Sequence, residues 1–290
     1  MTQIIERLED ISANYDVLLV DLWGCVHNGV TAFPDAVAAL QGYRARGGTV
    51  ALLTNAPRAR GPVADQIARL NVPDDAWDTL VTSGDSARAA MFRGLVGKKV
   101  WFIGQDHDLT FFDPLSVIED PVDITRVPME EAEGIICTGP FDPLADPSEM
   151  RGAFLYAKQK GLEMICANPD IVVDRGETRE WCAGALAELY KEMGGTAHYF
   201  GKPHPPIYDL AYRRIAELGK PVEKDRMLAI GDGALTDIPG AMGEGIDSLF
   251  ISGGLAAAET RTEAQPDPDA LGAYLSAQQI APTYTIGLLR

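Results

Sequence analysis

Seven short apolar runs recur along the chain and give the first indication of its fold. They cover residues 17–20, 50–53, 100–103, 134–137, 164–166, 227–230 and 248–251. Each run is too short for a helix and lacks alternation with polar residues, which is typical of strands buried on both faces. The pattern therefore predicts strands in the interior of a sheet.

Longer stretches with helical character lie between these runs. They cover residues 35–48, 58–70, 147–160, 183–193 and 206–218. The first, DAVAALQGYRARGG, ends in basic residues and then glycine, a common helix stop. Strands that alternate with helices of this length indicate right-handed crossovers and a mainly parallel sheet, so the predicted fold class is α/β.

Polar residues follow several of the apolar runs. Asp21 ends the first, Thr54 and Asn55 end the second, Lys202 follows HYFG, and Asp232 follows LAIG. Parallel sheets bind ligands at the carboxyl ends of their strands, so these side chains are candidates for one site. Two carboxylates, a hydroxyl and an ammonium suit a phosphate group together with a divalent metal.

A stretch with its own strand and helix signals separates the first of these candidates from the last. The sequence therefore predicts two domains, because 290 residues with 46% apolar content are enough for two cores. The first is discontinuous and comprises residues 1–81 and 198–290. The second, residues 82–197, is inserted into it.

Charge and composition limit the partners and the location. The 42 acidic and 25 basic residues give a formal charge of -17, which disfavours nucleic acid and anionic membranes. No apolar stretch is long enough to span a bilayer, and the acidic start MTQIIERLEDIS is unlike a signal peptide. Four cysteines without a CxxC spacing suggest neither a zinc cluster nor a disulfide framework. We expect a cytoplasmic protein.

Four segments in this order carry a resemblance to a known family. VLLVDLWG, ALLTNAPR, FGKPHPPIY and AIGDGALTDIPGA resemble the four motifs of the haloacid dehalogenase (HAD) superfamily of phosphohydrolases. Together with CANPD, they look like the class IIA branch, the NagD-like and nitrophenylphosphatase-like group. The resemblance implies a Rossmann-like parallel-sheet core with an inserted α/β cap of the C2 type, where residues 82–197 lie.

The resemblance also implies roles for the strand-end residues. Asp21 would attack phosphorus and form an aspartyl-phosphate that water then hydrolyses. Lys202 would neutralise charge on the nucleophile and the phosphoryl group. Thr54 and the backbone amides near Asn55 would hold phosphoryl oxygens.

A magnesium ion and a small phosphate ester are implied in the same way. Mg²⁺ would be held by Asp21, Asp232 and the backbone carbonyl of Trp23. Asp237 would mainly contact these ligands or their waters rather than the ion itself. In the cap, Asn168 and Asp170 would touch the leaving group or the catalytic edge of the core. Dimers formed through the cap are common in this branch, so a homodimer is expected by analogy.

Each of these residues also has a purely structural interpretation. Alone, Asp21 would more often be a helix cap or turn former, Thr54 a strand residue and Lys202 a surface charge. The loop Asn168–Pro169–Asp170 could be a simple turn. Four motifs in order favour the catalytic interpretation.

Trp23 departs from the resembled pattern, in which the second position after the nucleophile is usually an aspartate that acts as general acid and base. An indole cannot transfer a proton in this way. Such catalysis contributes about 10²–10⁴ in rate, so its loss should slow turnover of esters with poor leaving groups most. Another group, the substrate or water would have to supply the proton, and His27 is the nearest titratable candidate.

Three hypotheses remain from the sequence. The favoured one is a Mg²⁺-dependent phosphatase. The second is a phosphotransferase or slow phosphatase with a persistent aspartyl-phosphate, and the third is a non-catalytic protein that binds a phosphorylated ligand. Retention of Asp21, Thr54, Lys202 and Asp232 argues against the third. The large ring of Trp23 would also suit an aromatic or heterocyclic phosphate.

Overall fold

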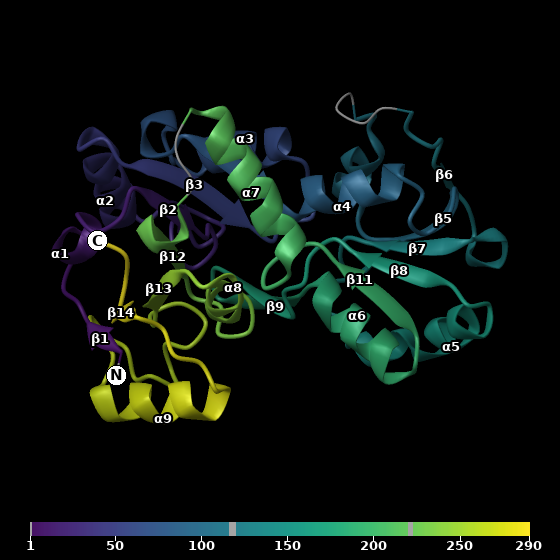
Figure 1. The fold of residues 1–290 in the computed structure, drawn as a ribbon. Helices are drawn as coiled ribbons and strands as arrows, with labels where there is room; N and C mark the ends of the chain where they lie inside the picture. Colours follow the sequence, from purple (N-terminus) through teal and green to yellow (C-terminus); the bar gives the residue numbers. More distant parts are fainter. Residues whose placement is uncertain (1, 116–119, 220–222) are drawn as a thin grey trace.

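The computed structural model describes residues 2–115, 120–219 and 223–290, which form two α/β units (Figure 1). Within these residues, seven parallel strands make the larger sheet in the order β1-β14-β13-β12-β2-β3-β4. The strands are β1 (Gln3–Ile4), β2 (Val17–Val20), β3 (Thr49–Thr54), β4 (Thr79–Thr82), β12 (Met227–Gly231), β13 (Asp247–Ile251) and β14 (Tyr284–Ile286).

Helices cover both faces of this sheet, which explains the uninterrupted apolar runs. Leu18 and Val20 of β2 belong to one buried cluster, to which helices α1 (Glu9–Ser12), α2 (Pro34–Ala45) and α3 (Arg60–Arg69) also contribute. Val17 and Leu19 belong to the cluster on the opposite face, which includes residues of α7 (Pro205–Glu217) and α8 (Asp237–Glu244). Helix α9 (Pro268–Gln278) packs beside Phe250 of β13.

The second unit is a smaller parallel sheet. Its described strands have the order β11-β8-β7-β5-β6. They are β5 (Lys99–Ile103), β6 (Thr125–Arg126), β7 (Gly134–Cys137), β8 (Glu163–Cys166) and β11 (Thr196–Tyr199), and helices α4 (Ser83–Phe92), α5 (Arg151–Gln159) and α6 (Ala183–Glu192) flank them. The predicted α/β class and the inserted second sheet are therefore confirmed. Strand β11 runs two residues beyond the boundary expected at 197.

The seven strands and five helices expected from the apolar pattern are all present, with ends shifted by a few residues. The pattern did not indicate the short antiparallel pair β9 (Val172–Arg175) and β10 (Thr178–Trp181), here called the cap hairpin. In Figure 1, β9 lies between the two units. The hairpin therefore lies where the cap meets the core.

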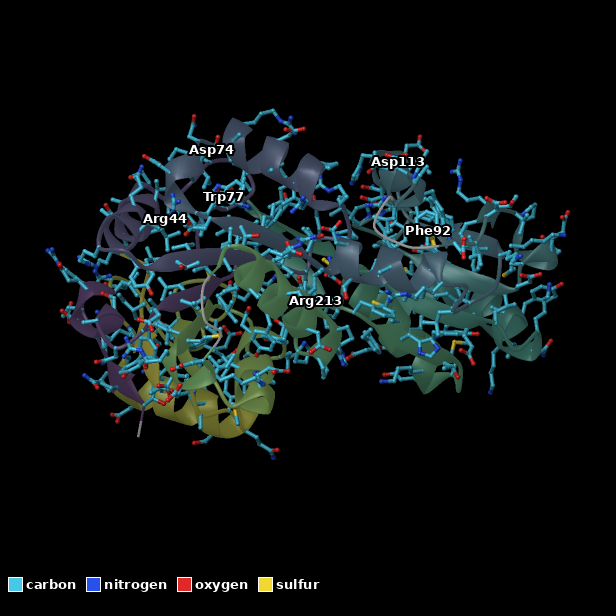
Figure 2. All side chains as sticks on the ribbon, turned by 45° about the horizontal axis from the view of Figure 1, so that its top comes forward. Arg44, Asp74, Trp77, Phe92, Asp113 and Arg213 are labelled. Atoms are coloured by element: carbon cyan, nitrogen blue, oxygen red, sulfur yellow. The ribbon has the colours of Figure 1, made fainter. Side chains whose placement is uncertain are left out.

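In each unit, an arginine on a helix forms hydrogen bonds that hold a neighbouring segment in place. Arg44 on α2 donates from Nε and Nη2 to the carboxylate of Asp78, at 3.0 and 2.6 Å, and lies near Asp74 and Trp77 in Figure 2. In the cap, buried Arg88 on α4 donates from Nε to the carbonyl oxygen of Phe111, at 2.8 Å. This contact anchors the 3-10 helix η2 (Asp106–Phe112). Among the described residues, no helix has the length and apolar content needed to cross a bilayer.

Candidate active site

Three of the expected site residues meet at the carboxyl edge of the larger sheet. Asp21 follows β2, Thr54 ends β3 and Asp232 follows β12, and these three strands are neighbours. The backbone N–H of Asp21 donates to the carbonyl of Ile230 at 2.8 Å, which continues the sheet pairing to the start of the site. All three side chains are buried.

Lys202 reaches this edge from the loop after β11. Its Nζ donates to Oδ1 of Asp21 at 2.6 Å and to Oδ1 of Asp237 at 2.7 Å. Only 2% of Lys202 is exposed to solvent. One buried ammonium therefore joins the expected nucleophile to the carboxylate at the start of α8.

Asn55 holds the loop that carries Lys202. Its Oδ1 accepts from the backbone N–H of Lys202 at 2.7 Å, and its Nδ2 donates to the Lys202 carbonyl at 3.1 Å. The same Nδ2 donates to Oδ1 of Asp170 at 2.8 Å. The side chain of Asn55 is therefore fully used in positioning, which leaves backbone amides for any phosphate contact in this segment.

The cap loop Asn168–Pro169–Asp170 meets the catalytic edge of the core through this contact. Asn168 Oδ1 accepts from the backbone N–H of Asp170 at 3.0 Å, which fixes the turn. Asp170 lies in the wall of the same cavity as Asp21. Burial raises the pKa of Asp170 to about 6, although Lys202 and Asn55 act in the opposite direction.

The buried cluster contains more carboxylate groups than the single ammonium of Lys202 can neutralise. Burial raises the pKa of Asp232 well above its ordinary value, and the charges of Asp21 and Asp237 add to the effect. Burial raises the pKa of Asp237 to about 6 against the lowering influence of Lys202. Burial opposes the charge on Lys202, but the carboxylates Asp21, Asp237 and Asp170 raise its pKa well above normal. The site therefore favours an additional cation.

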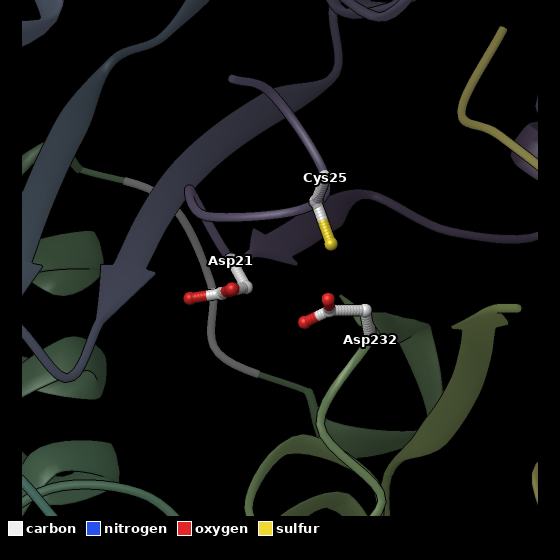
Figure 3. Close-up of side chains that lie close together, drawn as sticks. All are labelled: Asp21, Cys25 and Asp232. Atoms are coloured by element: carbon white, nitrogen blue, oxygen red, sulfur yellow. The ribbon is translucent and has the colours of Figure 1, made fainter. Parts of the chain in front are cut away.

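Figure 3 shows where such a cation would fit, between the carboxylates of Asp21 and Asp232. Ligand atoms of these two residues and of Cys25 lie within 4.8 Å of one another. Gly24 permits this arrangement, because a Cβ there would lie 2.1 Å from Oδ2 of Asp232. Burial raises the pKa of the Cys25 thiol well above normal, so the donors at neutral pH are chiefly oxygens. This donor set suits a hard divalent ion.

A cavity of about 130 Å³ lies between the cap and the core next to this cluster. Its core side includes Asp21, Thr54 and Arg58, and its cap side includes Asp108, Asp170 and the cap hairpin. The sequence did not indicate Arg58 or Asp108, which do not end apolar runs, nor the position of Cys25. Of the expected residues, Lys202, Asp232 and Asp237 lie in the adjoining charge cluster.

Trp23 joins the core to the cap hairpin. Its Nε1 donates to the carbonyl oxygen of Asp174 at 2.6 Å, and the Arg175 guanidinium lies 5.3 Å from its ring centroid. Gly29 lies directly against the indole, since a Cβ there would approach the ring to 2.4 Å. The indole N–H therefore already has a partner and is not available to a leaving group.

His27 does not fit the role of substitute acid. It is 2% exposed, packs edge-on against Trp23, and accepts from the backbone N–H of Gly29 through Nδ1 at 3.1 Å. Burial lowers its pKa to about 4, so the ring is neutral at pH 7. Since it does not line the cavity either, the expectation for His27 is not supported.

Family models match two segments of the chain. A haloacid dehalogenase-like hydrolase model matches residues 18–116, and a HAD-hydrolase-like model matches residues 199–277. A crystal structure of a haloacid dehalogenase-like hydrolase from Brucella suis 1330 superposes with a TM-score of 0.86 and 39% identity. The match covers 99% of this chain and 100% of that one.

Two characterised relatives are more distant. Ribonucleotide monophosphatase NagD from Escherichia coli K12 is 24% identical over 82% of this chain and 88% of its own length. Glycerol phosphate phosphatase Rv1692 from Mycobacterium tuberculosis, solved in complex with magnesium, superposes with a TM-score of 0.62 and 24% identity. That match covers 84% of this chain and 70% of the other.

Proposed function

Because the chain belongs to the haloacid dehalogenase superfamily, in its NagD and p-nitrophenylphosphatase (class IIA) branch, we propose that it hydrolyses a small phosphate ester through an aspartyl-phosphate on Asp21. The observation that carries the proposal is the contact of Lys202 Nζ with Asp21 at the wall of the cavity. An ammonium at 2.6 Å keeps Asp21 available as an anion although burial raises its pKa.

In the first step, a carboxylate oxygen of Asp21 bonds to phosphorus as the bond from phosphorus to the ester oxygen breaks. Lys202 reduces the repulsion between this anion and the phosphoryl group. Thr54 lines the same cavity, and its Oγ1 already accepts from the N–H of Ala56 at 3.2 Å. The hydroxyl of Thr54 would then donate its own proton to a phosphoryl oxygen.

The buried oxygen ligands fit Mg²⁺, which Asp21, Asp232 and the carbonyl of Trp23 would hold. Asp237 would contact neighbouring groups rather than the ion. The ion would stabilise the negative charge on the phosphoryl oxygens. Asp237 is already bound to Lys202 and accepts from the N–H of Gly233 at 3.1 Å, so its role is to orient neighbouring groups.

Asp170 supplies the proton that Trp23 cannot. Its carboxyl protonates the departing ester oxygen, and the resulting carboxylate then accepts a proton from the water that attacks the aspartyl-phosphate. Asp170 lines the cavity with Asp21, and the two are close enough for the charge of Asp170 to raise the pKa of Asp21. A pKa of about 6 leaves both protonation states populated near neutrality.

Turnover of p-nitrophenyl phosphate with Mg²⁺ tests the function. We expect Asp21→Asn to abolish turnover, and Asp65→Asn, an exposed carboxylate on α3, to retain it. A persistent aspartyl-phosphate would give one burst without turnover, and a non-catalytic binding protein would give no product. Either of those outcomes would contradict the proposal.

A further inference from the structure

The chain crosses between core and cap twice, and the two crossings lie against each other. The first, residues 82–84, leads from β4 into α4, and the second, residues 200–204, leads from β11 into α7 (Figure 1). A Cβ at Gly201, in the second crossing, would lie 2.7 Å from Oγ of Ser83, in the first, and 2.6 Å from Cδ of Pro169 in the cap. The cap loop that carries Asp170 therefore packs where the two crossings meet.

Asp85 lies in the first turn of α4, directly after the first crossing, and is paired with an arginine of the core. Nη2 of Arg214, in the last turn of α7, donates to Oδ2 of Asp85 at 2.6 Å, and Nη1 donates to the backbone carbonyl of Leu80. Only 12% of the Arg214 side chain and 10% of the Asp85 side chain are exposed. This buried ion pair therefore fastens the helix that leaves the core to the helix that returns to it.

The second oxygen of Asp85 contacts both units as well. Oδ1 accepts from the backbone N–H of Arg60, the first residue of α3 in the core, at 3.4 Å. Nη1 of buried Arg88, which faces the cap, lies 3.8 Å from the same oxygen. Arg88 also anchors η2, and Asp108 of η2 lines the cavity. One carboxylate therefore links two core helices to a wall of the cavity.

The first turn of α4 also packs on the loop that follows β3. The N–H of Gly84 donates to the carbonyl of Ala56 at 3.0 Å, and a Cβ at Gly84 would lie 2.3 Å from a backbone oxygen of this loop. In the same loop, Nδ2 of Asn55 donates to Oδ1 of Asp170 at 2.8 Å. The position of α4 therefore affects the position of Asp170 through two sets of contacts, those of this loop and those of Gly201.

The proposed chemistry needs Asp170 of the cap within reach of an ester bound at Asp21 of the core. Building on that proposed function, we propose that Asp85 is a positioning residue: its ion pair with Arg214 fixes the cap relative to the core and thereby places Asp170 for proton transfer. Asp85 does not line the cavity and touches no reacting group. Its effect on the rate comes from geometry, because a misplacement of about 1 Å can cost about 10²-fold.

Two aryl phosphates that differ in their need for a proton test this role. Phenyl phosphate and p-nitrophenyl phosphate share a ring, but phenolate is the poorer leaving group and gains more from general acid catalysis. The measured quantity is the ratio of kcat/KM for phenyl phosphate to kcat/KM for p-nitrophenyl phosphate. A variant that is only less stable has fewer folded molecules and loses the same factor on both esters, so its ratio does not change.

Variants of the ion pair should change this ratio. We expect Asp85→Asn and Arg214→Gln to lower it about 10- to 100-fold, and Asp85→Glu, which keeps the charge, to recover part of it. Arg214→Lys should lower it less, because an ammonium keeps the charge but loses the fork that reaches both Asp85 and Leu80. Asp78→Asn is the matched control, since Asp78 pairs with Arg44 at 2.6 Å within the core. Its Tm should fall while its ratio stays that of the wild type.

A double-mutant cycle shows whether Asp85 acts through Asp170. With Asp170→Asn already in place, adding Asp85→Asn should leave the ratio unchanged, because no proton donor remains to be positioned. A further fall in the ratio would mean that Asp85 acts on another group, and it would overturn the proposal. If Asp85→Asn does not fold, Arg214→Lys takes its place in the cycle, and an unchanged ratio in Arg214→Lys alone overturns the proposal.

The outcomes separate the two proposals. If the wild type hydrolyses both esters and the variants of Asp85 and Arg214 lower kcat/KM equally for both, the positioning role is overturned and the phosphatase stands. If Asp170→Asn alone leaves the ratio unchanged, the proton transfer assigned to Asp170 and the positioning role are both overturned, while hydrolysis at Asp21 stands. If the wild-type protein hydrolyses neither ester, the phosphatase and the positioning role are overturned together.

Discussion

Trp23 donates its indole N–H to the backbone carbonyl of Asp174 across the interface between core and cap, at 2.6 Å. A second interface bond runs from the N–H of Gly176 to the carbonyl of Asn28, at 3.2 Å. Trp23, two positions after the proposed nucleophile Asp21, therefore fastens the cap hairpin to the core. In the proposed mechanism, the proton therefore comes from another group in the cavity.

Replacing Trp23 by phenylalanine removes this bond and keeps an aromatic ring. The loss of one hydrogen bond of about 1 kcal/mol should lower Tm by about 2–4 °C and speed hydrogen exchange in residues 172–181. Trp77→Phe is a matched control, because the Nε1 of Trp77 has no partner among the described residues. Unchanged exchange in the hairpin would mean that the bond does not hold it.

Substituting Asp170 with asparagine tests the proton donor. Because the pKa of Asp170 is raised to about 6, its acid form is lost as pH rises through that value, and turnover of alkyl phosphates should fall accordingly. Asp170→Asn should lower kcat/KM for alkyl esters, which reports formation of the aspartyl-phosphate, about 10²–10⁴-fold and remove this pH dependence, while kcat/KM for p-nitrophenyl phosphate, whose leaving group needs no protonation, falls much less. An equal loss for both esters would argue against general acid catalysis.

Trp23→Asp adds a carboxyl where the resembled family keeps one. The slope of log kcat/KM against leaving-group pKa should become shallower, since alkyl esters would gain a second proton donor. The same change removes the support of the cap hairpin, so Tm should fall as it does in Trp23→Phe. A slope that stays the same in a folded variant would show that this position no longer has access to the leaving oxygen.

Asp232→Asn tests the metal site through stability. In metal-free protein the folded-state pKa values of Asp170 and Asp237, about 6, exceed the unfolded value of about 3.9. The contribution of these two carboxyl groups to the free energy of unfolding is therefore complete below about pH 4, where both are protonated. It is lost as pH rises through 6. Burial and the charges of Asp21 and Asp237 raise the pKa of Asp232 well above its ordinary value, so this carboxyl also lowers stability at pH 8, and Asp232→Asn should raise Tm there without metal. It should also abolish the increase in Tm that Mg²⁺ gives the wild type. A Mg²⁺-dependent increase that survives in Asp232→Asn would place the ion elsewhere.

The core of the site was predictable because buried parallel strands have a simple sequence pattern. A run that is apolar on both faces and then ends in a polar residue places that residue at the edge of the sheet. This rule located Asp21, Thr54 and Asp232. The cap hairpin has no such pattern, because β9 and β10 are only partly buried and contain Asp, Arg, Glu and Thr.

Contacts between distant segments could not be predicted from the pattern. Arg58 and Asp108 face one cavity only because the cap folds back over the core. Likewise, nothing in the sequence near His27 indicates the burial that lowers its pKa to about 4. Charge partners and burial depend on tertiary packing, which a single sequence does not reveal.

The most direct test of the account is to trap the covalent intermediate. Wild-type protein is mixed with p-nitrophenyl phosphate and Mg²⁺, quenched in acid within a turnover, digested, and analysed by mass spectrometry, with Asp21→Asn as the control. We expect one phosphoryl group on the peptide that contains Asp21, absent from the variant. Phosphorylation of another residue, or product formation with no modified Asp21 peptide at any quench time, would contradict it.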